Sequence, residues 1–270
     1  MTAHPAPILA TLPDIAADEI DAHYSRLPES YFVQADAAQV SLHLRMVNRL
    51  LQAISTADSL GTLRPVIEWQ DDERRGHTAV HVVTWDRAGL FHQLAGACNV
   101  AGLNILSARI TTRSDHIAID TFQVVAAGGG PVQSRAAKLT FARTVEEALV
   151  GHVDLLDAIL AQAQNRNASR SVPAAAVGTP AVDIYCEIRS PRLIVEIRAP
   201  DRIGLLYRVG RVLAGQDFNL SSAVVATERG QAVDRFHVEP AAGRPVDDAR
   251  VTALHAALLA AISEANGGAR

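Results

Sequence analysis

The stretch "TWDRAGLFHQLAGACNVAGLNIL" (residues 84–106) decides the fold, because a variant of it returns as "APDRIGLLYRVGRVLAGQDFNLS" (residues 199–221). An aspartate, a glycine and an asparagine recur in the second stretch, each displaced by 115 residues with no insertion between them. A repeat of this length indicates two copies of one structural unit. At 270 residues, the sequence is long enough for two domains of ordinary size.

The first copy reads as a strand, a helix, a hairpin and a second helix. Residues 78–85 are rich in β-branched side chains, which favour strands. Apolar side chains then recur at helical spacing over residues 90–101. Residues 104–113 and 116–127 alternate apolar with polar side chains around a short turn, which predicts a hairpin. Residues 135–163 contain no proline and are rich in Ala, Leu and Glu, which predicts one long helix.

The second copy repeats this order. We expect a strand at 192–199, a helix over 205–212, a hairpin of 220–228 with 231–239, and a helix over 247–264. The chain therefore contains two domains of the same kind.

An extra apolar segment precedes each copy, at residues 65–69 and 182–188, and each can form a further strand. A β-α-β-β-α unit with one more strand is the ferredoxin-like arrangement, in which helices cover one face of an antiparallel sheet. We predict the α+β class, with two ferredoxin-like (βαββαβ) domains whose sheet edges meet, since an uncovered edge invites aggregation. The sequence leaves open whether 182–188 completes the preceding copy or edges the following one.

The first 60 residues differ from both copies. Residues 12–27 and 36–54 have helical apolar spacing, and Asp36 is placed to cap the second helix. We predict a helical segment at 1–62, a first domain at 63–164, a linker at 165–180 and a second domain at 181–270.

Three residue types recur at equivalent points of the copies: an aspartate ahead of the helix, a glycine at its start and an asparagine opening the next strand. They are Asp86 and Asp201, Gly89 and Gly204, and Asn104 and Asn219. The aspartate can simply cap the helix, and the asparagine can simply form a turn. The free amides of a helix start also favour an anion such as a carboxylate, and an asparagine amide can bind a zwitterion. Their joint recurrence favours a binding site.

The phrases "DRAGLF" with "GLNILSARI" and "DRIGLL" with "FNLSSAVVATERGQAVDRFHV" resemble ACT domains. More narrowly, residues 65–262 resemble the tandem C-terminal ACT pair of the bifunctional uridylyltransferase/uridylyl-removing enzyme, which modifies the nitrogen-regulatory PII protein. The segment "LPESYF" and the His-bearing helix after it resemble the region that precedes that pair. The departures are Ala88 and Ile203, where the family usually has proline.

The resemblance implies a regulatory pair that senses glutamine. It carries ligand binding over to Asp86, Gly89, Leu90, Asn104 and Ile105 in the first copy, and to Asp201, Gly204, Leu205, Asn219 and Leu220 in the second. The implied partners are a small amino acid, a PII-type signalling protein or catalytic partner, and a second copy of the chain in a homo-oligomer.

Several function classes lack their sequence signals. No Asp-x-Asp pair is available for nucleotidyl transfer, and no histidine is followed by aspartate as the hydrolase of the relatives requires. We expect no catalytic residues, no cofactor and no metal site.

A formal net charge of −4 gives no basic footprint for nucleic acid. No apolar run reaches the roughly 18 residues that span a membrane, so a cytoplasmic location is expected. Cys98 and Cys186 are expected to be buried free thiols.

Three functions remain open. The first is a non-catalytic sensor that binds a small amino acid between its ACT modules. The second is an interaction module whose ACT sheets only dimerise. The third is a stand-alone regulatory subunit of a split PII uridylyltransferase.

Overall fold

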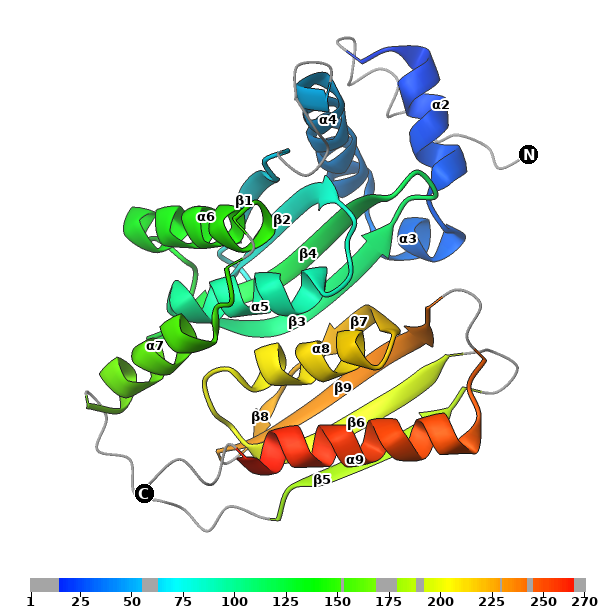
Figure 1. The fold of residues 1–270 in the computed structure, drawn as a ribbon. Helices are drawn as coiled ribbons and strands as arrows, with labels where there is room; N and C mark the ends of the chain where they lie inside the picture. The colour runs from blue at the N-terminus through cyan, green and yellow to red at the C-terminus, as the bar shows by residue number, and fades with distance from the viewer. Residues whose placement is uncertain are drawn as a thin grey trace. The chain divides into compact units, whose positions relative to one another are not determined.

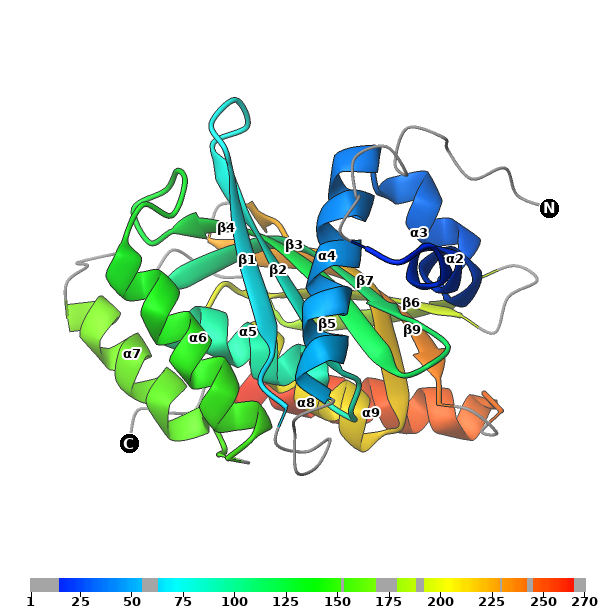
Figure 2. The ribbon, with the colours of Figure 1, turned by 90° about the horizontal axis from the view of Figure 1, so that it is seen from above.

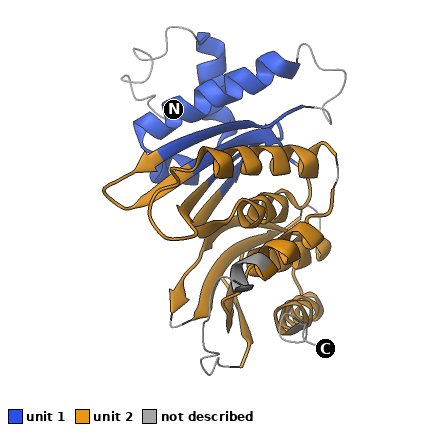
Figure 3. Ribbon diagram, turned by 90° about the vertical axis from the view of Figure 1, so that its left-hand side faces the viewer, with its two compact units in different colours: residues 1–70, 80–86, 110–121 blue, residues 71–79, 87–109, 122–270 orange. Residues whose placement is uncertain are grey.

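The computed structural model is an α+β protein (Figure 1). It describes residues 15–54, 63–151, 153–168, 179–187, 192–228, 230–241 and 245–264. The chain divides into two compact units (Figure 3). The first unit comprises residues 1–70, 80–86 and 110–121, and the second comprises residues 71–79, 87–109 and 122–270. The domain boundaries inferred from the repeat stay a prediction, and most of the expected linker at 165–180 lies outside the described residues.

The first copy follows the expected order of elements. It comprises β1 (Val66–Asp72), β2 (His77–Trp85), α5 (Leu90–Val100), β3 (Leu103–Thr112), β4 (Ile117–Ala126), α6 (Arg135–Leu149) and α7 (Leu156–Ala168). The strand, helix and hairpin of the repeat are therefore confirmed, and the extra segment at 65–69 is a strand.

The prediction of one long helix at 135–163 is wrong, because α6 and α7 are separate helices (Figure 2). Gly151 lies at the break, where an added Cβ would come within 2.7 Å of the carbonyl oxygen of Glu147. The Asp154 carboxylate then accepts a hydrogen bond from the Leu156 amide at 2.8 Å and so supports the start of α7. The helix pattern continued through this break because neither residue interrupts the apolar spacing.

The second copy comprises β5 (Ala181–Cys186), β6 (Leu193–Pro200), α8 (Leu205–Gly215), β7 (Phe218–Val224), β8 (Thr227–Glu228), β9 (Gln231–Pro240) and α9 (Asp248–Glu264). Strand β5 pairs antiparallel with β6, from Ala181 opposite Arg198 to Cys186 opposite Leu193. The extra strand therefore edges the copy that follows it. The chain order is β-β-α-β-β-α, with the extra strand ahead of the repeat.

The two copies meet through their edge strands. The hydrogen-bonded strand order is β1-β2-β4-β3-β7-β9-β6-β5, with β8 on β9. Strands β3 and β7 pair antiparallel, with Ala108 opposite Ala223. The expectation that the sheet edges meet is confirmed, and this pairing satisfies backbone groups that an open edge would leave exposed.

Helices cover one face of the second copy's sheet. Figure 1 shows α8 and α9 side by side over β5, β6, β7 and β9. The other face carries cross-strand ion pairs, including Arg198 with Asp183 at 3.0 Å and Arg235 with Glu196. A sheet with one charged face needs cover on its apolar face alone.

The N-terminal segment consists of α2 (Ala17–Arg26), α3 (Glu29–Gln34) and α4 (Ala37–Ile54). Its apolar side chains form one core with Val83, Ile117 and Ile119 of the first copy's strands. Asp36 caps α4 as expected, since its carboxylate accepts a hydrogen bond from the Gln39 amide at 2.9 Å. Helix α3 was not expected from the sequence. The segment supplies apolar cover for the ends of β2 and β4.

A buried polar chain links this segment to the strands. The Tyr31 hydroxyl lies 2.7 Å from Nδ1 of His43, and Nε2 of His43 lies 2.8 Å from Nδ1 of His81. His81 also contacts the Thr121 hydroxyl at 3.1 Å and Gln70 at 3.2 Å. His81 is thus a hydrogen-bonded core histidine. Such a network fixes the position of α4, because any one missing member leaves buried polar atoms unpaired.

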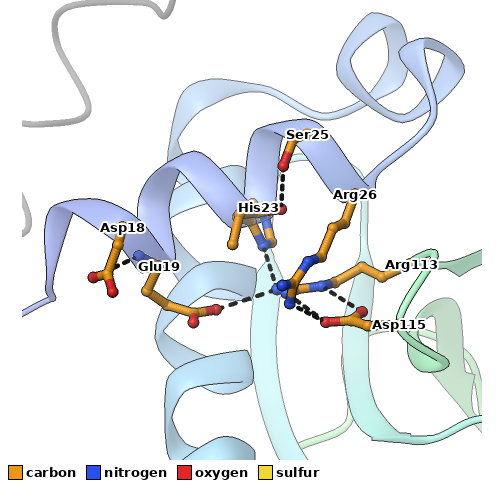
Figure 4. Close-up of polar contacts among 8 residues, drawn as sticks. Asp18, Glu19, His23, Ser25, Arg26, Arg113 and Asp115 are labelled. Carbon is orange, nitrogen blue, oxygen red and sulfur yellow. Dashed lines mark hydrogen bonds and ion pairs between the residues drawn. The ribbon is translucent and has the colours of Figure 1, made fainter.

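A second link is a buried guanidinium, shown in Figure 4. Arg113 is fully buried, donates to both oxygens of Asp115 at 2.9 and 3.1 Å, and reaches Glu19 of α2 at 3.4 Å. Nδ1 of His23 lies 3.4 Å from the same guanidinium. Burial, and then the charge of Arg113, lower the pKa of His23 to about 3, so this ring is neutral. Burial would raise the pKa of Asp115, but hydrogen bonds and charges from Arg113 and Arg26 outweigh it and lower that pKa.

Candidate functional site

Both repeated helices begin at a glycine in the left-handed conformation. Gly89, with φ of 78°, is the N-cap of α5, and Gly204, with φ of 88°, is the N-cap of α8. Residues other than glycine rarely adopt this backbone conformation, so the turn itself requires glycine. The recurrence of these two residues therefore has a structural reason that is independent of any ligand.

The aspartates ahead of the helices do not serve as their N-caps. The Asp201 carboxylate accepts a hydrogen bond from the Thr227 hydroxyl at 2.9 Å, and its backbone amide donates to the carbonyl of Gly230 at 3.0 Å. The amide of Asp86 donates to the carbonyl of His116 at 2.7 Å in the equivalent turn. These bonds tie each aspartate to the turn of the hairpin, and the N-cap residue of each helix is a glycine, which has no side chain to cap it.

Each copy has a buried carboxyl group on an interior strand of its sheet. Neither residue was among the candidates predicted from the sequence. Asp120 on β4 is 0% exposed and Asp234 on β9 is 1% exposed. Within the described part of the chain, neither carboxylate has a hydrogen-bond partner. Such a group is costly to bury in its charged form. A bound proton or a cationic partner would therefore stabilise each of these two carboxyl groups.

The ionisation of both groups reflects this burial. Burial, with a smaller contribution from the charge of Asp201, raises the pKa of Asp234 to about 7. The Ala226 amide opposes the rise but makes no hydrogen bond of normal geometry. Burial, and then the charge of Asp86, raise the pKa of Asp120 well above its ordinary value. Each copy thus pairs a buried carboxyl group with the aspartate of its repeated phrase.

A second repeat could have revealed these residues. The pattern Ala-x-Asp-x-Phe-x-Val occurs at residues 118–124 and again at 232–238, displaced by 114 residues. The displacement differs from 115 because the second hairpin is one residue shorter at its turn. In both copies, an aspartate within an otherwise apolar strand pattern indicates a buried carboxyl group.

The two repeated helices pack closely in opposite directions. An added Cβ on Gly96 of α5 would come within 2.8 Å of the Tyr207 ring on α8, and one on Gly210 would come within 2.8 Å of His92. The His92 and Tyr207 rings meet edge to face at 5.3 Å. Small residues therefore let α5 and α8 approach until their backbones nearly touch.

This packing decides which predicted site residues come together. Helix α5 is about 16 Å long at 1.5 Å per residue, so Gly89 and Asn104 lie at its opposite ends. The start of β3 instead runs toward the end of β7, where the Val225 amide donates to the carbonyl of Leu106 at 3.0 Å. Thr227 follows there and bonds Asp201. The pairing therefore places Asn104 near the helix start of the other copy. Because the two copies pack antiparallel, it places Asn219 near Gly89 in the same way.

The α8 start is already engaged by the first copy. The Gly204 amide donates to Oδ1 of Asn99 at 3.1 Å, and the Asn99 side-chain amide donates to the carbonyl of Ala95 at 2.8 Å. An added Cβ on Gly204 would lie 2.8 Å from Ile159 of α7. Asn99 escaped the sequence analysis because its equivalent in the second copy is Ala214.

The remaining predicted site residues divide by exposure. Leu90, Leu205 and Ile105 are buried, Leu220 is half-buried, and Asn104 and Asn219 are exposed. Cys98 is buried as expected, and burial raises the pKa of its thiol, whereas Cys186 is exposed and contradicts the expectation. Cys186 ends strand β5, which lies at the edge of the sheet among the described strands.

Within the described residues, no group of three or more His, Cys, Asp or Glu side chains could hold a metal ion. None of the helices there is long and apolar enough to cross a membrane.

Comparison with known proteins assigns one part of the chain to a family and finds relatives of the rest. Residues 193–258 match the ACT domain model. The bifunctional uridylyltransferase/uridylyl-removing enzyme of Rhodospirillum rubrum is 32% identical over 264 residues, which are 96% of this chain and 26% of that enzyme. The enzyme of Gluconobacter oxydans is 33% identical over 238 residues, 87% of this chain and 24% of its own length. The chain thus spans about a quarter of the length of the curated relatives it matches.

Among solved structures, aspartate kinase from Synechocystis is 14% identical, with a TM-score of 0.38 over 70% of this chain and 27% of its own. That likeness is too weak to support the fold, which follows from the strand pairings and the family match. Residues 193–258 are therefore an ACT domain, and the chain resembles the C-terminal regulatory region of the bifunctional uridylyltransferase/uridylyl-removing enzyme.

Proposed function

We propose that this chain is a non-catalytic regulatory module that binds a small amino acid at the starts of α5 and α8. ACT domains are regulatory and generally bind such ligands, which supports the proposal. Glutamine is the first candidate, with a role in nitrogen signalling, because of the resemblance to the uridylyltransferase/uridylyl-removing enzyme.

One observation carries the proposal. At the α8 start, a left-handed glycine turn, Asp201 and the unpaired buried carboxyl group of Asp234 belong to the same end of one copy. Helix amides favour a carboxylate, and carboxyl groups favour an ammonium group. Both charges of an amino acid therefore have complementary groups there, and Asn104 of the other copy adds an amide.

Ligand binding has a direct test. A ligand that binds only the folded state raises the melting temperature, so screening the twenty amino acids should single out glutamine or a close analogue. Asn104→Ala and Asn219→Ala should each weaken calorimetric binding by about 5- to 150-fold, because a ligand polar group loses its partner. Asn48→Ala on α4 is the matched control and should leave the affinity unchanged. Unchanged affinity in both site variants would place the ligand elsewhere.

A stand-alone regulatory subunit of a split uridylyltransferase is the second candidate, favoured by the 96% of this chain that aligns with part of the bifunctional uridylyltransferase/uridylyl-removing enzyme. Because the chain lacks Asp-x-Asp and His-Asp pairs, we predict that it alone neither uridylylates purified PII with UTP and Mg²⁺ nor removes the group. Radiolabel transfer from UTP to PII above the no-protein blank would contradict this. Stable association with a separate catalytic polypeptide would favour the second candidate over a free sensor.

A further inference from the structure

We propose that Asn99 holds the α8 start closed to ligand, so that the two copies bind amino acid unequally; this regulation rests on the binding site proposed above. An amide oxygen that accepts from the Gly204 amide occupies the position an incoming carboxylate oxygen would take. The Asn99 side chain is held in place at its other end by the carbonyl of Ala95. A ligand must displace it before it can bind.

Apolar packing adds to this closure. Ile159 is buried and stands against Gly204, and it belongs to a cluster with Ala148, Leu155 and Tyr207. The Tyr207 hydroxyl donates to the Asp154 carboxylate at 2.7 Å, which ties the start of α7 to α8. Helix α7 of the first copy therefore covers the α8 start of the second copy.

Among the residues that the structure describes, no side chain takes the place of Asn99 at the α5 start. The two helices run antiparallel. Asn99 contacts Gly204, Gly96 contacts Tyr207 and His92 contacts Gly210, so residues nearer the start of α5 meet residues nearer the end of α8. This packing brings Gly89 opposite Ala214, whose methyl side chain offers no acceptor. The close neighbour of Gly89 is instead His92 of its own helix.

A buried acid, Asp234, lies close enough to Asp201, just ahead of the α8 start, to be affected by its charge. Asp234 is 1% exposed and both its oxygens lack a partner within the described residues, while Asp201 is the charged group that acts on it. Displacing Asn99 would join helix amides to these carboxyl groups, an arrangement complementary to a zwitterion. In this proposal, Asn99 competes with the ligand for the Gly204 amide.

Calorimetry with glutamine tests this. The wild-type chain should show two sites whose affinities differ by about fivefold to tenfold, the effect expected for one competing hydrogen bond. Asn99→Ala should tighten the weaker site by that factor. Asn99→Asp keeps an oxygen acceptor at Gly204 and should leave the two sites unequal. Ala214→Asn should weaken the tighter site by supplying the α5 start with its own competitor. Melting temperatures near the wild-type value confirm folding.

The outcomes separate this inference from the proposed function. Two equal wild-type sites, or an unchanged weaker site in Asn99→Ala, would overturn the inference and leave amino-acid binding intact. No binding of any amino acid by the wild type or by Asn99→Ala would overturn both. Binding by Asn99→Ala alone would support the inference and contradict a ligand at α5.

Discussion

Asp234→Asn is expected to raise the free energy of unfolding by about 4 kcal/mol at pH 8. The carboxyl group is buried without a hydrogen-bond partner, and its pKa in the folded protein is about 7. Above that pH the folded state must hold an unpaired buried charge, whereas the unfolded chain exposes the same carboxylate to water. The neutral amide of asparagine removes the charge at nearly constant shape.

The sign follows from proton binding. Because the pKa is raised on folding, the folded state holds more protons between pH 4 and 7 than the unfolded chain. The free energy of unfolding therefore falls as pH rises through this window and levels off above it. Asp234→Asn should gain little at pH 4 and most at pH 8.

Urea unfolding at pH 4, 6 and 8 measures this difference. Asp183→Asn changes an exposed carboxylate of β5 and serves as the matched control, expected to shift stability by less than about 1 kcal/mol at every pH. An Asp234→Asn variant no more stable than the wild type at pH 8, with the same pH slope, would contradict the account of this group.

Arg113→Met is expected to lower the free energy of unfolding by about 3 kcal/mol. The substitution keeps much of the apolar stem but removes the fully buried guanidinium that joins Asp115, Glu19 and His23. The loss lies at the low end for a broken buried pair, because Asp115 keeps its bond with Arg26 and both carboxylates reach solvent.

Arg49→Met is the matched control for Arg113→Met. It breaks an ion pair with Glu68 of 2.6 Å, but both side chains are more than a third exposed. Such a pair contributes up to about 1 kcal/mol. Equal losses in the two variants by urea unfolding would show that burial of the Arg113 cluster adds nothing.

The repeat made most of the fold predictable. One phrase displaced by 115 residues was enough to predict the strand, helix and hairpin of both copies and their edge-to-edge pairing. The break between α6 and α7 was not predictable from periodicity, because it depends on Gly151 and on a side-chain cap from Asp154. The place of β5 was undetermined, since an apolar strand can pair on either side and only backbone bonds with β6 decide it.

The candidate site was less predictable than the fold. The repeat located Gly89 and Gly204, but their left-handed backbone explains them without a ligand. Asp234 was hidden by the one-residue shift of the hairpin, and Asn99 by having no repeated equivalent. Cross-copy contacts such as that of Asn99 with Gly204 depend on how α5 and α8 pack, which no local pattern encodes.

Titration of the uniformly ¹⁵N-labelled chain with glutamine tests amino-acid binding at the helix starts most directly. The account predicts saturable shifts of the amide resonances at the start of α5, centred on Gly89, with those around Gly204 moving at higher ligand concentration. Alanine at the same concentrations serves as the reference for non-specific shifts. Saturable binding that leaves the amides at both helix starts unmoved, or no binding of any amino acid, would contradict the account.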